Sequence, residues 1–354
     1  MRIWTIGFTR AALELAARLG EGFAQGGDSA EAWAPARLAE ATGACAYVDL
    51  ASWAARAWRE ADALLFVSAC GIAVRAIAPQ VHDKLTDPAV VCVDEAGRFA
   101  VPLLSGHVGG ANGLARRVAT LCGGEAVVTT ATDVNGVFAV DEWAVRNGLA
   151  LVGREAARAV SATLLEGGAV GLASDVPLCG TLPEGVVTGS AVEGAEVGIA
   201  IGLDATRQPF ATTVHLVPRT VSVGVGCRRG VPRGRIAELV DACLREARVA
   251  PEAVCALATI DRKADEEGIV SLADARGWEL RLFGADELAA VPGEFPSSEF
   301  VRETVGVGNV CERAACACGG ALLLGRRSGD GVTVALGYRE PTLSFDGPAE
   351  GGSR

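Results

Sequence analysis

The sequence predicts an α/β fold made of mostly parallel sheets with helical crossovers, in two to three domains. Short apolar strand segments alternate with segments of helical period along nearly all of the 354 residues, and this alternation is typical of parallel sheets. Half of the residues are hydrophobic but only 5% are aromatic. We therefore expect packing to depend on close contacts between helices and sheets rather than on large rings.

The first predicted domain covers residues 1–136 and repeats a strand–helix pattern. In the segment 111–121, for example, Leu114, Val118 and Leu121 share one helical face, while Arg116 and Arg117 point elsewhere. The expected elements are strands 3–8, 63–67, 89–93, 99–103 and 126–130, helices 11–19 and 111–121, and turns at 26–29 and at Gly71. The strands 89–93 and 99–103 form a hairpin around Asp94 and Glu95, for which we expect no catalytic role.

The rest of the chain divides into a middle domain (137–217), a C-terminal domain (218–343) and a small polar tail (344–354) predicted to be disordered. The middle domain has few ionisable groups in its loops and is expected to be a structural insert or lid. Its predicted elements are helices 141–147 and 155–166 and strands 170–173 and 197–201. Those of the C-terminal domain are strands 220–226, 254–260, 279–283, 321–324 and 332–337 and helices 235–248, 268–276, 285–290 and 311–318.

Composition excludes several classes of protein. The net charge of −11 argues against nucleic-acid binding, which needs a basic surface. No apolar run reaches the roughly 20 residues of a membrane helix, and the first residues do not resemble a secretory signal. Eleven cysteines without such a signal are expected to be reduced thiols, so we expect a cytoplasmic protein.

The segment Ser105-Gly106-His107-Val108-Gly109-Gly110 is the leading candidate for a site. Gly109 and Gly110 let a ligand approach the backbone, and the following helix N-terminus favours an anion. His107, one of three histidines in the chain, is expected to act there as a base or proton shuttle, although a lone histidine is often structural. Ser105 is a candidate nucleophile, but Ser-Gly-His is not the usual nucleophile elbow, which favours a hydrogen-bonding role.

Asp133 follows the next predicted strand and is a candidate partner for His107. The alternative is a turn in which the Asp133 side chain bonds its own backbone before Asn135-Gly136. Both interpretations stay open at this point.

The turn Gly224–Gly230 is the second candidate. Its glycines resemble a dinucleotide fingerprint, but the spacing G-x-G-x-x-x-G is wrong and arginines crowd it. Arginines suit carboxylates, and a solvated basic loop is the alternative. Cys227 is a candidate nucleophile or a packing residue.

Three further thiols come close together in the sequence. Cys311, Cys316 and Cys318 do not converge on one face of the predicted helix. We therefore expect buried hydrophobic thiols and no metal site.

With these residues described, the chain closely resembles the CbiG-type cobalt-precorrin-5A hydrolases of anaerobic cobalamin biosynthesis. Three parts carry the resemblance: GIAVRAIAP through LLSGHVGGANGLA (71–115), TATDVNGVFAVDEWA (130–144), and the C-terminal runs GVGCRRG, ATIDRKADEEG, PSSEFV and VGVGNVCERAA. The first sixty residues match only in their strand–turn–helix pattern.

The resemblance implies hydrolysis that ends in carbon–carbon cleavage. The family opens the δ-lactone between the ring A acetate and the extruded meso carbon, then releases acetaldehyde to give cobalt-precorrin-5B. Cobalt enters within the substrate, so no cofactor or metal of the protein's own is expected. The expected partner is this anionic cobalt-tetrapyrrole, with transient contacts to other pathway enzymes and none to nucleic acid or membrane.

An acidic protein must gather cations locally to bind such a polycarboxylate. The expected substrate-binding residues are Gly71, Arg75, Lys84, Gly109, Gly110, Asn112, Cys227, Arg228 and Lys263. His107, Ser105 and Asp133 are the expected catalytic residues, and N–H groups near Gly109 and Gly110 are expected to stabilise the oxyanion.

Two other functions compete with this interpretation. The C-terminal domain also resembles stand-alone CobE-type proteins, which favours a non-catalytic protein that binds or escorts corrinoid intermediates. A nucleotide-dependent dehydrogenase would need the dinucleotide fingerprint that the spacing at Gly224 does not supply.

Overall fold

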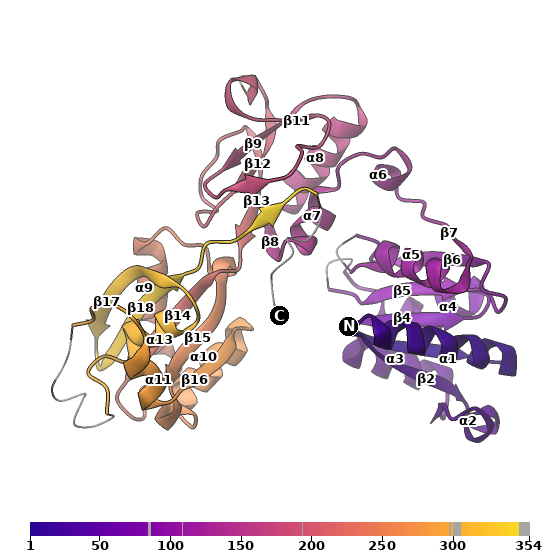
Figure 1. The fold of residues 1–354 in the computed structure, drawn as a ribbon, viewed down its shortest axis with the longest axis horizontal. Helices are drawn as coiled ribbons and strands as arrows, with labels where there is room; N and C mark the ends of the chain where they lie inside the picture. Colours follow the sequence, from indigo (N-terminus) through magenta and orange to yellow (C-terminus); the bar gives the residue numbers. More distant parts are fainter. Residues whose placement is uncertain (84–85, 108, 193, 297–298, 300–305, 347–354) are drawn as a thin grey trace. The chain divides into compact units, whose positions relative to one another are not determined.

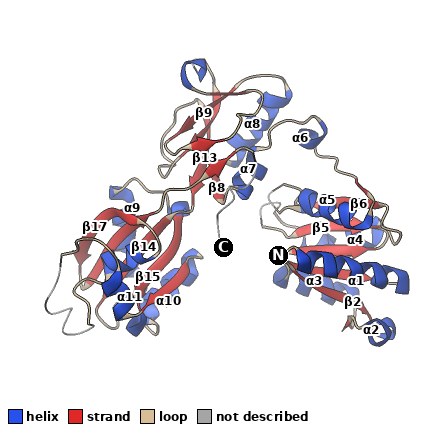
Figure 2. Ribbon diagram, in the orientation of Figure 1, coloured by secondary structure: helices blue, strands red, loops and turns tan. Residues whose placement is uncertain are grey.

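The computed structural model describes residues 1–83, 86–107, 109–192, 194–296, 299 and 306–346. The chain forms two compact units, Met1–Glu142 and Trp143–Arg354. Both are built of helices packed on mainly parallel sheets (Figures 1 and 2), which confirms the predicted fold class. Within the described residues, no helix is both long and apolar enough to cross a membrane.

The first unit is built on one sheet of seven strands, counted over the described residues, in the order β3-β2-β1-β4-β5-β6-β7. Strands β1 to β5 pair in parallel, and β6 turns back antiparallel to β5. β4 and β5 are buried along their whole length, as expected for strands covered on both faces. The strands are β1 (Arg2–Gly7), β2 (Ser29–Pro35), β3 (Cys45–Tyr47), β4 (Ala63–Val67), β5 (Ala89–Val93), β6 (Phe99–Leu104) and β7 (Glu125–Ala126).

Helices cover both faces of this sheet. α1 (Arg10–Gln25) and α5 (Ala111–Cys122) pack on one face, and α3 (Leu50–Glu60) and α4 (Cys70–Ile77) pack on the other. The Thr9 hydroxyl caps α1 by accepting the Ala12 N–H at 3.1 Å. α1 passes the predicted stop at Gly20 because its buried face continues from Leu19 to Phe23, which outweighs the modest helix penalty of one glycine.

Two expectations for this unit are wrong, and one stretch contains elements for which the sequence analysis made no prediction. Gly71 lies in the first turn of α4 rather than in a loop. The strand expected at 126–130 is only β7, after which the chain enters the short helix α6 (Ala131–Val134), so Asp133 lies on a helix. Between Ser29 and Glu60 the unit also contains β2, α2 (Ala36–Thr42), β3 and α3. The β2 sequence SAEAWAP has weak strand propensity, and its pairing with β1 makes it a strand.

The second unit begins with a sheet in the order β11-β9-β12-β13-β8. Helix α7 (Val140–Arg146) precedes it, and α8 (Arg154–Leu165) packs on β12 and β13. The strands are β8 (Leu149–Val152), β9 (Val170–Ser174), β11 (Val186–Val187), β12 (Val197–Ile201) and β13 (Thr212–Pro218), with a 3₁₀ turn η2 (Gly189–Val192).

The start of the tail is ordered, contrary to expectation. β19 (Leu343–Ser344) pairs in parallel with β10 (Leu178–Cys179), and the ring of Phe345 stacks on Trp143 with centroids 4.8 Å apart. The Asp346 carboxylate accepts the Thr181 N–H at 3.0 Å. Apolar burial of Leu343 and these contacts fix residues that composition alone marks as polar. The remainder of the predicted disordered tail, 347–354, lies outside the described residues.

The C-terminal sheet has the order β16-β15-β14-β18-β17. Its strands are β14 (Val221–Cys227), β15 (Val254–Ile260), β16 (Glu279–Phe283), β17 (Ala321–Gly329) and β18 (Val332–Tyr338). The helices are α9 (Arg233–Glu246), α10 (Glu267–Arg276), α11 (Ala285–Ala290) and α13 (Cys311–Ala317), with the short 3₁₀ turns η3 (Pro251–Ala253) and η4 (Asp261–Lys263). A further 3₁₀ turn, η1 (Ala78–Gln80), belongs to the first unit.

Glycines allow α13 to approach this sheet closely. A Cβ added at Gly224 would collide with the backbone carbonyl of Cys311, and one at Gly337 would meet that of Ala315 at 2.5 Å. α9 and α10 contribute Ile236, Val240 and Leu272 to the core of this domain. α13 therefore packs on this sheet through close backbone contact, as the composition predicts, but large rings also fill the cores, with Trp278 in this domain and Trp4, Trp33, Trp53 and Phe66 in the first unit.

Candidate active site

The loop that carries His107 uses its own backbone donors. The N–H groups of Gly110, Ala111 and Asn112 donate to the carbonyls of His107, Ser105 and Gly106 at 3.0, 3.1 and 2.9 Å. Of the N–H groups near Gly109 and Gly110 that are expected to stabilise an oxyanion, that of Gly110 is engaged within the loop in this structure. A Cβ at Gly109 would collide with the Ser105 side chain, so this glycine serves close packing. Val108 lies outside the described residues.

Ser105 is held as a structural residue. Its backbone has φ 56°, in the left-handed region, and its buried hydroxyl donates to the Asp87 carbonyl at 3.0 Å. The Asp87 carboxylate in turn accepts the N–H groups of His82 and Asp83, both at 2.9 Å. The hydroxyl is thus engaged in hydrogen bonding, the role that the sequence favours over nucleophilic attack.

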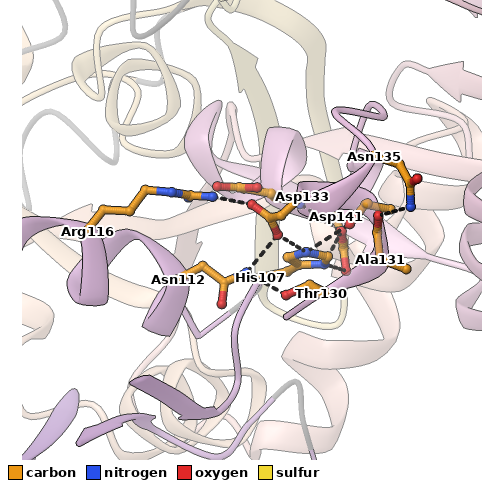
Figure 3. Close-up of polar contacts among 10 residues, drawn as sticks. His107, Asn112, Arg116, Thr130, Ala131, Asp133, Asn135 and Asp141 are labelled. Atoms are coloured by element: carbon orange, nitrogen blue, oxygen red, sulfur yellow. Dashed lines mark hydrogen bonds and ion pairs between the residues drawn. The ribbon is translucent and has the colours of Figure 1, made fainter. Parts of the chain in front are cut away.

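His107 lies between two carboxylates (Figure 3). Its Nε2 is 3.1 Å from Asp133 on α6, and its Nδ1 is 3.3 Å from Asp141 on α7. The Thr132 hydroxyl lies 3.2 Å from Nε2. Only 15% of the His107 side chain is exposed, with 11% of Asp133 and 17% of Asp141, so solvent screens these ion pairs weakly.

These neighbours set the charge of the imidazole. The hydrogen bond to Asp141, with the charges of Asp141 and Asp133, raises the pKa of His107 to about 8, and burial opposes the rise. At neutral pH the ring is therefore mainly an imidazolium that can donate a proton. The structure favours an acid as the resting form of His107 over the base that the sequence suggested.

Asp133 is fixed as a carboxylate by several donors (Figure 3). Burial alone would raise its pKa, but hydrogen bonds from Arg116 and His107 lower it below the usual value. Asn112, almost fully buried, donates its Nδ2 to Asp133 and to the Thr130 hydroxyl, both at 2.9 Å. The Asp133 side chain therefore contacts α5 and the His107 loop, and does not form the turn that was the alternative.

A cavity of about 330 Å³ opens beside this cluster. The lining combines polar side chains of the cluster with the end of β6. It is lined by Pro102, Leu103, Leu104, Ser105, Gly106, His107, Asn112, Thr129, Thr130 and Asp141. A proton donor, an amide and hydroxyl groups thus meet one partly apolar space, which is the usual composition of a small-molecule site.

His107, Asp133 and Glu142 could also bring donor atoms to one metal ion, since these atoms lie within 4.8 Å of one another. Arg116 and the imidazolium of His107 already form ion pairs with the Asp133 carboxylate. A metal would have to displace both the guanidinium contact and the proton. This donor set therefore suits a proton better than a metal ion.

The predicted residues of the first unit do not all gather at this cavity. β6 ends beside the start of β5, because Leu104 pairs with Val90, whereas Gly71 follows the carboxyl end of β4. Gly71 and the His107 loop thus lie at opposite edges of the sheet. The exposed Arg75 donates to the Gly71 carbonyl at 3.0 Å. Lys84 lies outside the described residues.

The predicted residues of the C-terminal domain gather at the carboxyl ends of β14 and β15. Lys263 is not an available cation, because its Nζ lies 2.7 Å from Glu266 and both side chains are at least 88% buried. Glu266 also accepts the Gly230 N–H at 2.6 Å, so the pair fixes the turn. Burial raises the pKa of Cys227, and the Arg228 side chain packs along Gly331. In this structure Lys263 is paired with Glu266, and its contact with a substrate carboxylate stays a prediction.

Sequence reasoning missed Arg116, Thr130, Thr132 and Asp141. Asp141 begins a helix, where an acidic residue is ordinarily explained by the helix dipole. For Arg116 the helical pattern predicts only that it points away from the apolar face of α5. No local signal marks either as a partner of Asp133 or His107.

Comparisons with known proteins match most of the chain. The family model described as Cobalamin synthesis G N-terminal matches residues 52–133, and Cobalamin synthesis G C-terminus matches 221–337. The chain is 37% identical to the cobalt-precorrin-5A hydrolase of Salmonella typhimurium, over 81% of this chain and 85% of that one. It is 31% identical to the enzyme of that name from Priestia megaterium, over 77% of each chain.

Among solved structures, a cobalamin biosynthesis protein G homologue from Sulfolobus solfataricus has 20% identity and a TM-score of 0.42, over 95% of this chain and 97% of that chain.

Proposed function

The chain belongs to the family of CbiG-type cobalt-precorrin-5A hydrolases, and from that premise we propose that it is itself a cobalt-precorrin-5A hydrolase. Family membership gives it a role in cobalamin biosynthesis as a hydrolase. In the proposed reaction it opens the ring A acetate δ-lactone and releases acetaldehyde, leaving cobalt-precorrin-5B.

The observation that carries the proposal is a buried imidazolium facing a cavity. Lactone hydrolysis needs a proton for the departing ring oxygen as water attacks the carbonyl carbon, and the water releases its own two protons to the solvent as the carboxylate forms. His107, with a pKa of about 8, can supply that proton, and Asp133 and Asp141 stabilise and orient the ring. His107 is the proposed catalytic residue, and the two carboxylates act through it.

The second step reverses the same proton transfer. The new hydroxyl returns its proton to the now neutral His107 as its oxygen forms the carbonyl of acetaldehyde. The carbon–carbon bond breaks, and its electron pair passes into the conjugated macrocycle. His107 thus donates one proton in the first step and takes one back in the second, so one residue serves as the proton shuttle for both steps.

Substrate binding is expected to use cations outside the His107 cluster. Arg75 and Arg228 remain the proposed contacts for acetate or propionate groups, because neither forms an ion pair with a carboxylate among the described residues. Cobalt enters within the substrate in this scheme, and the protein supplies no metal. All eleven cysteines are free thiols, which favours the proposed cytoplasmic location.

Single-turnover release of acetaldehyde from cobalt-precorrin-5A tests the proposal. His107→Ala and His107→Asn are expected to lower the rate at saturating substrate by about 10²-fold or more, the usual contribution of a general acid. His82→Gln, at a histidine outside the cluster, is the matched control and should react normally. An unchanged rate in both His107 variants would remove His107 from the mechanism, and corrinoid binding without any release in the wild type would favour the escort function.

A further inference from the structure

A second cavity, here called the amino-edge cavity, lies in the C-terminal sheet. It encloses about 150 Å³. Its walls come from the starts of the parallel strands β14, β15 and β16, the residue after β18, and the turn that follows α13. Cys227 and Lys263 lie at the opposite, carboxyl ends of these strands, so the cavity is separate from the turn that the sequence singled out.

Two arginines give the amino-edge cavity a surplus of positive charge. The Arg281 Nε lies 3.6 Å from Glu279, an exposed and therefore weak pair. Arg339 has no carboxylate within 4 Å among the residues that the structure describes. With one carboxylate set against two guanidinium groups, the lining carries a net charge of about +1.

The guanidinium groups act on the thiols of the cavity wall, Arg281 on both and Arg339 on Cys255. Burial raises the pKa of Cys255, and the charges of Arg339 and Arg281 oppose that rise. Burial likewise raises the pKa of Cys318 to about 11, against the opposing charge of Arg281. The thiols are thus neutral at physiological pH and do not cancel the arginine charge.

A buried hydroxyl in the wall also lacks a partner. Thr220 Oγ1 is inaccessible to solvent and forms no hydrogen bond within the described part of the chain. The neighbouring Ser222 hydroxyl, by contrast, donates to the Ala315 carbonyl at 2.7 Å. Buried polar groups are ordinarily paired, so Thr220 is a donor for which a ligand oxygen would be the acceptor.

We propose that the amino-edge cavity binds a carboxylate group, held by Arg281 and Arg339 and by a hydrogen bond from Thr220. A single carboxylate matches the single surplus charge, and arginine binds carboxylates with two parallel hydrogen bonds. The thiols, Ala256 and Gly320 offer uncharged walls for a short methylene stem. The carboxylate belongs either to a free small organic acid or to an acetate or propionate side chain of a tetrapyrrole, and only the second source rests on the proposed function.

Alkylation of the full chain at neutral pH tests this proposal. A thiolate displaces iodide from iodoacetate and from iodoacetamide in the same way. The two reagents differ in charge, because only iodoacetate carries a carboxylate. The ratio of the iodoacetate rate to the iodoacetamide rate, measured by peptide mass spectrometry, is expected to be about tenfold higher at Cys255 than at the exposed Cys45, as for one charge-assisted contact. Arg281→Gln and Arg339→Gln should abolish the difference.

Arg327→Gln is the matched control, because Arg327 is 43% exposed and paired with Glu246, much as Arg281 is 45% exposed and paired with Glu279. It should leave the ratio unchanged. Protection of Cys255 by propionate would identify small organic acids as ligands, and protection only by a porphyrin bearing acetate and propionate groups would identify the macrocycle. Equal reagent ratios at Cys255 and Cys45, with no protection by either probe, would overturn the proposal. The readout needs no turnover, so its failure is distinct from failure of the hydrolase function.

Discussion

His107 illustrates how two carboxylates turn a neutral ring into a charged one. Each ring nitrogen faces an aspartate from a different helix, α6 or α7. Arg116 and Asn112 keep Asp133 ionised from the other side. The chain therefore holds a proton in a half-buried place where an isolated histidine would lose it.

The ion pairs of His107 should be visible in its titration. Its imidazole should titrate near pH 8, above the usual value for histidine. With only three histidines in the chain, imidazole NMR signals can be assigned with His82→Gln and His107→Asn variants. The raised pKa stabilises the fold by at most about 2 kcal/mol. This contribution is fully present below about pH 6.5 and is lost as the pH rises through about 8. A titration near pH 6.5 would contradict the assigned ion pairs.

Asp141→Asn should lower the pKa of His107, because the hydrogen bond to Asp141 is the largest cause of its rise. If the protonated ring is the catalyst, wild-type acetaldehyde release falls as the pH rises through about 8, and in the variant this fall moves to lower pH. The pH dependence of kcat measures this shift. Asp330→Asn, at an exposed residue paired with Arg235, is the control that should leave the profile in place.

At the scale of elements, local pattern predicted what local forces determine. The ranges of β12, β15, β16 and α11 match the sequence prediction residue for residue, because strong alternation or glycine boundaries mark them. β2 and β3 were missed because alanine-rich segments carry no strand signal. β2 is a strand because it pairs with β1, and β3 because it pairs with β2. Asp133 was a candidate partner of His107 with a local turn as the alternative, and Asp141 was not a candidate, because only the fold brings α7 to the ring.

The close approach of α13 to β14 makes Gly224 sensitive to substitution. Gly224→Ala should destabilise the C-terminal domain by about 1–3 kcal/mol, because the added methyl group meets the Cys311 carbonyl. Urea unfolding measures the loss. Gly234→Ala, on α9 with nothing within 4 Å of the new atom, should instead be neutral or stabilise by up to about 1 kcal/mol. Equal effects at both positions would contradict the packing described for α13.

At the scale of the whole molecule, the chain returns on itself within the second unit. After the C-terminal sheet, residues 343–346 pair with β10 and lie against Trp143. The Trp143 indole N–H donates to the Ser344 carbonyl at 2.9 Å. The Asn147 side-chain oxygen accepts the backbone N–H of the same serine. Residues 201 positions apart, Trp143 and Ser344, thus depend on one another.

Deletion of residues 343–354 tests this dependence. It removes the buried Leu343 side chain and leaves the Trp143 indole without its acceptor, so we expect the second unit to lose about 2–4 kcal/mol. Trp143 fluorescence, assigned with Trp143→Phe, should shift to the red. Deletion of 347–354 keeps these contacts and is the control. Equal stability of the two truncated chains would show that residues 343–346 contribute nothing.

The amino-acid pattern was enough to predict the α/β class and most strands and helices, and to mark Asp133 as one candidate partner of His107. These follow from periodicity and residue chemistry, which act over a few neighbours along the chain. The tertiary structure alone decided that the loop consumes its own N–H donors, that Glu266 neutralises Lys263, and that Gly71 lies across the sheet from His107. Each depends on strand direction and on partners distant in sequence, and hydrogen bonds and charges are satisfied by whichever groups the fold brings nearest.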